Sequence, residues 1–195
     1  MLVAALIVTL GVAQPELLDR TLALVGGQAI TLSDVRAAIA LHLVDDPKGG
    51  VAEVTSRLVD RELILREVQR YAPPPPEASA VEARLNEIRS RVAAPLPDTL
   101  ANYGFTETRL RAWVRDDLRT QAYLEQRFAS ASVPSDAEVA AAYTRQRAEF
   151  DSQGLTFDQA VPVLRGRLVQ ARRSELVVDW LADLRRRTDV VILAQ

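Results

Sequence analysis

The sequence has 195 residues, enough for one ordinary domain with a sizeable core. Apolar residues make up 48% and charged residues 26%, a globular balance, while aromatic residues are scarce at 5%. A net charge of −2 gives no overall field that would recruit nucleic acid. The chain has no cysteine and a single histidine, which excludes disulfides, thiol catalysis, Cys-based zinc sites and two-histidine metal sites.

The first residues predict export. Residues 2–13 are apolar and uncharged, and this run is shorter than the ~20 residues that a membrane-spanning helix needs. Its length suits the apolar core of a signal peptide, and Gly11-Val12-Ala13 provides small residues at an acceptable cleavage site. We therefore expect residues 1–13 to be a signal peptide, with a mature periplasmic or otherwise exported protein that begins at Gln14. The alternative is a buried N-terminal strand or helix.

Residues 21–31 predict a β-hairpin. Gly26-Gly27 lies between two apolar runs and can adopt the positive φ angles of a tight primed turn. Thr31 is a favourable N-cap residue for a helix that follows directly. The other convincing strand is DVVIL at 189–193. Because an isolated hairpin is only marginally stable in water, we expect this C-terminal strand to pair with the hairpin.

The sequence between the strands predicts helices. Apolar residues recur at helical spacing in 33–44, 51–71, 79–94, 106–129, about 135–150 and 156–187, and a short helical turn is expected at 98–103. The expected fold class is mainly α, a multi-helix domain with a small sheet formed by the hairpin (about 21–31) and the C-terminal strand (about 189–193). Residues 14–195 are expected to form one domain, in which 155–195 completes the part built from 14–150.

Several local features refine this prediction. Ser135 with Glu138, and Thr156 with Gln159, have the spacing of a capping box. Pro162 should kink the last helix or reset its start. Pro73–Pro76 favours a stiff spacer, with an SH3-type ligand as the alternative. His42 lies within ALHLV and is expected to be a partly buried helix residue, with a pH switch as the alternative.

Motifs for catalysis are missing from the sequence. It contains no glycine-rich phosphate loop, no H-E-x-x-H and no G-x-S-x-G, and without cysteine the common nucleophile–base pairs are unavailable. Acidic neighbours make the arginines of 109–119 a solvated charged face rather than a phosphate-binding site. The arginines of 185–187 lie in the last turn of a helix, where cations oppose its negative end, and three such residues are a weak nucleic-acid signal. We expect no catalytic, cofactor-binding or metal site, and a helical binding or scaffold protein rather than an enzyme.

Five segments carry a family pattern when they are taken in order. They are ALVGGQAITLSDV (23–35), LVDRELILREVQRYA (58–72), YGFTETRLRAWVRDDLRTQAYLEQRF (103–128), VPSDAEVAAAYTRQRAEF (133–150) and TFDQAVPVLRGRLVQARRSELVVDWLADLRRRTDVVIL (156–193). Together they resemble the SurA/PrsA/PpiD-type folding factors of bacteria. In such multidomain relatives a parvulin prolyl isomerase of about a hundred residues lies between the last two segments. Here about six residues, Asp151–Thr156, separate them.

The resemblance implies an exported, ATP-independent chaperone domain without the isomerase, which binds unfolded or extended polypeptides such as outer-membrane proteins. Such binding needs an adaptable apolar and aromatic surface, and each candidate aromatic has core packing as its alternative role. Alternative functions are a peptidyl-prolyl cis-trans isomerase family member and a structural adaptor in an envelope complex. The candidate polypeptide-binding residues are Tyr71, Tyr103, Phe105, Trp113, Tyr123, Phe128, Tyr143 and Phe150.

Overall fold

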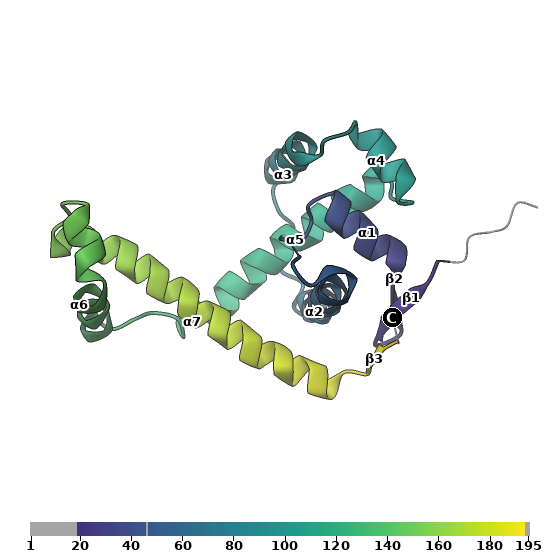
Figure 1. Cartoon of the computed structure of the whole chain (residues 1–195). Helices are drawn as coiled ribbons and strands as arrows, with labels where there is room; N and C mark the ends of the chain where they lie inside the picture. The colour runs from purple at the N-terminus through teal and green to yellow at the C-terminus, as the bar shows by residue number, and fades with distance from the viewer. Residues whose placement is uncertain (1–18, 46, 194–195) are drawn as a thin grey trace, which may run out of the picture.

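The computed structural model describes residues 19–45 and 47–193 and has two parts (Figure 1). The head contains the sheet and the first five helices, and the arm consists of α6 and the N-terminal part of α7. The remainder of α7 runs back along the head to the last strand. The architecture is mainly α with one small sheet, as the sequence predicts. The expected signal peptide at 1–13 and the expected start at Gln14 lie outside the described residues.

The sheet joins the two ends of the described chain. β1 (Thr21–Val25) lies between β2 (Gln28–Thr31) and β3 (Val190–Ile192), and both pairings are antiparallel. Gly26 and Gly27 have φ angles of 53° and 88°, the positive pair that a primed hairpin turn requires. The predicted pairing of the C-terminal strand with the hairpin is therefore confirmed.

The predicted helices are present, with shifts at their ends. The short helical turn expected at 98–103 is present as the helix α4 (Leu96–Asn102), which begins two residues earlier. The helix at 156–187 begins at Phe157, so Pro162 lies inside it and does not reset its start. The helices are α1 (Leu32–Ala40), α2 (Gly50–Tyr71), α3 (Ala78–Arg91), α4 (Leu96–Asn102), α5 (Glu107–Phe128), α6 (Asp136–Ser152) and α7 (Phe157–Arg187).

The first helix ends earlier than the predicted 33–44, and the expectation for His42 is wrong. The backbone N–H of His42 donates to the Ile39 carbonyl (3.1 Å) and that of Leu43 donates to the Ala38 carbonyl (2.9 Å). This pair of bonds is a Schellman motif, in which the residue after the cap adopts a left-handed conformation. His42 occupies that position with a φ of 51°. Its side chain is exposed and lies outside the helix.

The core is divided into three clusters of buried side chains. The main cluster joins the sheet and α2 to Tyr123 and Phe128 of α5 and to Trp180 and Leu184 of α7. A second cluster lies between α1, α3, α4 and α5. The arm cluster shares no residue with the other two, and it consists of Val139, Ala142, Phe150, Ala160 and Leu164. The arm therefore has a small core of its own, whereas the C-terminal part of α7 belongs to the head.

Capping and ion pairs fix the base of the arm. The backbone N–H of Ser135 donates to Oε2 of Glu138 at 2.7 Å, and the Ser135 side chain accepts from the Glu138 backbone N–H. Arg172 of α7 forms an ion pair with the same carboxylate. The backbone and hydroxyl of Ser135, together with Arg172, lower the pKa of Glu138 to about 2. The predicted capping boxes are confirmed at Ser135 and at Thr156, where Gln159 accepts from the backbone N–H (2.9 Å).

Across 19–45 and 47–193, no helix combines the length and the apolar character that crossing a membrane would require.

Candidate functional site

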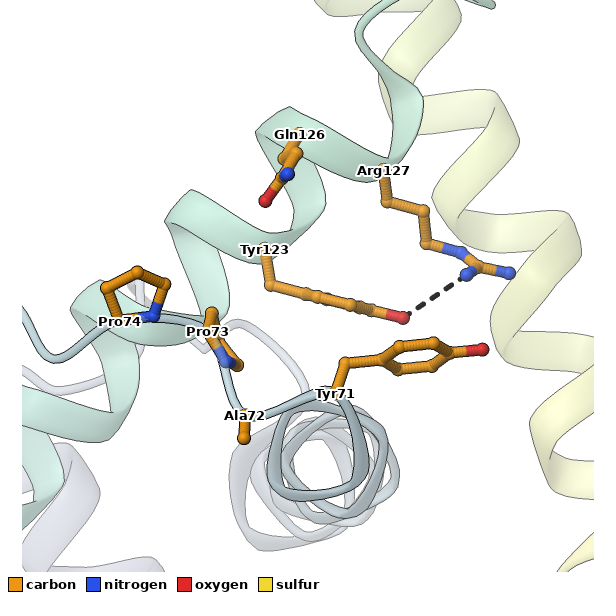
Figure 2. Close-up of a pocket in the computed structure, with 7 residues that line it drawn as sticks. All are labelled: Tyr71, Ala72, Pro73, Pro74, Tyr123, Gln126 and Arg127. Carbon is orange, nitrogen blue, oxygen red and sulfur yellow. Dashed lines mark hydrogen bonds between the residues drawn. The ribbon is translucent and has the colours of Figure 1, made fainter.

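A hollow of about 490 Å³ opens where the end of α2, the proline linker and the C-terminal part of α5 meet (Figure 2). We call it the tyrosine hollow, because two tyrosine rings from different helices face each other in it. The residues that line it are Tyr71, Ala72, Pro73, Pro74, Tyr123, Gln126 and Arg127.

The backbone after α2 turns sharply to form one side of this hollow. Ala72 is the C-cap of α2 and has a left-handed conformation, with φ 44° and ψ 56°. Its N–H donates to the Val68 carbonyl at 2.9 Å, and the turn brings Pro73 and Pro74 below and beside the Tyr123 ring (Figure 2). A left-handed residue other than glycine costs about 1–2 kcal/mol. Strain of this kind is concentrated at functional sites.

The aromatic rings connect the surface of the hollow to the main cluster. The Tyr71 ring lies 5.7 Å from that of Tyr123 and the Tyr123 ring lies 6.0 Å from that of Trp180, centroid to centroid. Tyr71 is 59% exposed, whereas Tyr123 is only 6% exposed. Tyr71 therefore offers a large ring to solvent while it rests on a buried, fixed partner. Such an amphipathic ring suits a binding surface, because its apolar body and polar tip can both contact a ligand.

Arg127 lies at the far side of the Tyr123 ring. Its Nη1 donates to the Tyr123 hydroxyl at 3.2 Å, and its guanidinium carbon lies 4.8 Å from the centroid of the Trp180 ring. Burial raises the pKa of the Tyr123 hydroxyl, which is therefore neutral at physiological pH. Among the described residues no carboxylate forms an ion pair with Arg127.

A second hollow adjoins the first across Arg127. It has a volume of about 430 Å³ and is lined by Arg127, Trp180, Asp183, Arg186 and Arg187. We call it the Trp180 hollow. Because Arg127 lines both, the two hollows form one continuous surface that runs from the proline linker to the last turns of α7.

Four of the eight candidate aromatic residues line hollows. Tyr71 and Tyr123 lie together in the tyrosine hollow. Tyr103 and Trp113 are half-buried in two separate hollows of about 520 and 280 Å³. The guanidinium of Arg61 covers the Trp113 ring at 3.6 Å.

The other four candidates serve packing in the structure. Phe105 and Phe128 are buried in the second and the main cluster, and Phe150 in the arm cluster. Tyr143 is half-buried in the arm, with its ring stacked on Phe150 (5.8 Å) and edge-on to Phe157 (5.1 Å). None of these four side chains lines one of the hollows of the head.

Sequence reasoning missed Arg127 and Trp180 as site residues. Trp180 is not among the eight candidate aromatic residues. Arg127 follows Tyr123 by one helical turn, so the spacing i, i+4 already places both on one face. The prolines of 73–76 were expected to form a spacer, and two of them, Pro73 and Pro74, also line the tyrosine hollow.

The charged faces are rich in ion pairs. Arg109, Arg111 and Arg119 each pair with a carboxylate, and so does each arginine of 185–187. Within the part of the chain that the structure describes, no group of three His, Cys, Asp or Glu residues could hold a metal ion.

No protein-family model matches the sequence, and no curated protein matches it significantly. The fold is similar to a solved chain of the SurA-like chaperones PEB4 and Cj1289 from the human pathogen Campylobacter jejuni. The TM-score is 0.54 at 10% sequence identity, and the match covers 90% of this chain and 100% of the other. The head, the arm and the sheet that joins the chain ends therefore make up the fold of a SurA-like chaperone.

Proposed function

We propose that this protein is an ATP-independent chaperone that binds unfolded or extended polypeptides, with the tyrosine hollow as its central contact. The observation that carries the proposal is the exposed Tyr71 ring, which rests on buried Tyr123 beside two prolines. Aromatic and apolar groups at an open surface can contact many sequences, while the polar rim keeps the free protein hydrated. The SurA-like fold supports this role.

The proposal also includes the hollows lined by Tyr103 and Trp113, and it excludes prolyl isomerase activity. Half-buried Tyr103 and Trp113 line other hollows of the head and would add contacts for a long client. We propose no prolyl isomerase activity, because only residues 151–156 stand where the family pattern carries a parvulin domain. The protein would therefore shield clients from aggregation without changing the isomers of their proline bonds.

We expect the protein at severalfold excess to suppress the aggregation of an unfolded outer-membrane protein, measured by light scattering. Tyr71→Ala should weaken client binding roughly fivefold or more, the effect of losing one aromatic anchor of over 1 kcal/mol. The fold should remain, since Tyr71 is 59% exposed. Val133→Ala, at a side chain 61% exposed and outside the hollows described here, is the matched control.

No suppression by the wild-type protein would overturn the proposed function. If the Tyr71 and Val133 variants lost protection of the client equally, the tyrosine hollow would not be the client-binding surface. A proline-peptide assay on the same preparation should show no acceleration of cis–trans isomerisation, and clear catalysis would contradict the proposed absence of isomerase activity.

We propose that the protein acts after export. The apolar run at 2–13 supports this, and Cj1289 is described as a periplasmic protein. N-terminal sequencing of the mature protein from a bacterial host should read Gln14 as the first residue. A mature protein that retains Met1 would contradict the predicted cleavage.

A further inference from the structure

The charges around the tyrosine and Trp180 hollows are not balanced. Glu67 of α2 pairs with both Arg70 (3.1 Å) and Arg187 (3.7 Å), and Asp183 pairs with Arg186. Three arginines are thus compensated by two carboxylates, and Arg127 has no carboxylate partner among the described residues. The surface has an excess of positive charge at the one point where its two hollows meet.

The guanidinium of Arg127 is also held in place. It is an exposed side chain, yet the Tyr123 hydroxyl accepts one of its hydrogen bonds and its planar group lies near the rings of Trp180 (4.8 Å) and Phe128 (5.6 Å). An arginine has five N–H donors, so most of them stay available. A guanidinium that is already oriented loses less entropy when it forms the paired hydrogen bonds of a carboxylate.

From these observations we propose that Arg127 binds the side-chain carboxylate of an Asp or Glu within an extended client segment, while a neighbouring apolar residue of that segment contacts Tyr71. The surface continues past Arg127 into the Trp180 hollow, so the client chain need not end there. An internal acidic residue therefore fits better than a chain end. This inference rests on the proposed function and specifies the clients that bind best.

Arg127 and Tyr71 lie against the same buried ring. The Arg127 guanidinium carbon lies 6.0 Å and the Tyr71 ring centroid lies 5.7 Å from the centroid of the Tyr123 ring. In an extended chain, side chains two residues apart point to the same side and are separated by roughly 6.5 Å, twice the rise per residue. A segment with an apolar residue, any residue, and then Asp or Glu presents both groups to one face and is therefore the segment used in the test.

The test uses fluorescence anisotropy of the full chain with three labelled peptides in a Gly/Ser background. The first contains Leu-Ser-Asp and is capped at both ends, and the second contains Leu-Ser-Asn with the same caps. The third contains Leu-Ser-Asn with a free C-terminal carboxylate. The Asp peptide should bind roughly tenfold more tightly than the capped Asn peptide, the effect of one charge-assisted hydrogen-bonded pair.

Two variants separate Arg127 from general electrostatics. In Arg127→Gln the Asp and Asn peptides should bind with equal affinity. Arg115→Gln, at an exposed arginine of the same helix, should retain the tenfold preference. Arg127→Lys keeps the charge without the planar fork and should show a smaller preference, and circular dichroism should confirm that every variant is folded.

Each contrary result has a distinct meaning. A preference that persists in Arg127→Gln, or that follows the free chain end of the third peptide, overturns the carboxylate site. Equal binding of all three peptides by the wild type also overturns it but leaves the proposed chaperone function in place. Absence of binding to any peptide, together with absence of aggregation suppression, overturns both.

Discussion

Removal of residues 189–195 should lower the melting temperature of the head by roughly 10 °C, measured by circular dichroism. β3 pairs with Ala23–Val25 of β1, and two further bonds extend the ladder, from the Gly26 N–H to the Asp189 carbonyl (2.8 Å) and from the Leu193 N–H to the Leu22 carbonyl (2.9 Å). Four or so backbone hydrogen bonds at ~1 kcal/mol each amount to about 4 kcal/mol. In a chain of this length each kcal/mol shifts the melting temperature by about 2–4 °C.

The loss should reach the whole head, because β1 contributes buried Leu22, Ala23 and Val25 to the main cluster. A shorter truncation that removes only residues 194 and 195 is the matched control and should melt like the full chain. If the longer truncation also melted at the unchanged temperature, β3 would not stabilise the sheet. Exposure of the β1 edge should in addition favour edge-to-edge association, visible as larger species in size-exclusion chromatography.

Phe150→Ala should unfold the arm while the head stays folded. Phe150 is 1% exposed and is the largest side chain of the arm cluster, which shares no residue with the clusters of the head. Truncation of a buried phenylalanine costs about 3–5 kcal/mol of folding stability. A core of only five buried residues has little stability to lose, so this cost should unfold the arm. Amide hydrogen exchange should show protection lost in α6 and in the N-terminal part of α7 and retained in β1 and α2.

Val163→Ala is the matched control for this prediction. Val163 is on α7, the other helix of the arm, and is 44% exposed, so its truncation should change stability by less than about 0.5 kcal/mol. Loss of protection throughout the head of the Phe150 variant would show that the arm and the head unfold as one unit. The reverse variant, Trp180→Ala, should destabilise the head, since Trp180 packs on Tyr123 and Phe128.

Much of the fold could be predicted because its signals are local. The Gly26-Gly27 turn, the Thr31 N-cap and the capping box of Ser135 with Glu138 depend on residues no more than three positions apart, and the structure has all of them. The end of α1 could not be predicted in this way. ALHLV continues the helical apolar pattern, but the chain turns at His42, and Leu41 and Leu43 then pack in the second cluster and at its boundary with the main one.

The candidate site was predicted less completely. The sequence supplied aromatic residues of the right kind, but it gave no means to separate Phe150, which is 1% exposed, from Tyr71, which is 59% exposed. Both lie near the end of an amphipathic helix. Their difference arises from what covers them, since α7 packs over Phe150 whereas Tyr71 has a partner, Tyr123, on one side only.

The sequence by itself determined the order of the elements, their caps and turns, the small sheet and the mainly helical class. The elements, caps and turns depend on backbone conformations that neighbouring residues impose, and the sheet follows because a hairpin that is marginal alone pairs with the other predicted strand. Only the tertiary structure decided which aromatic rings reach solvent, that Arg127 lies between two hollows, and that it has no carboxylate partner there. The exposure of each ring and the net charge around Arg127 depend on side chains from three separate helices, α2, α5 and α7. A sequence pattern within one segment therefore cannot predict them.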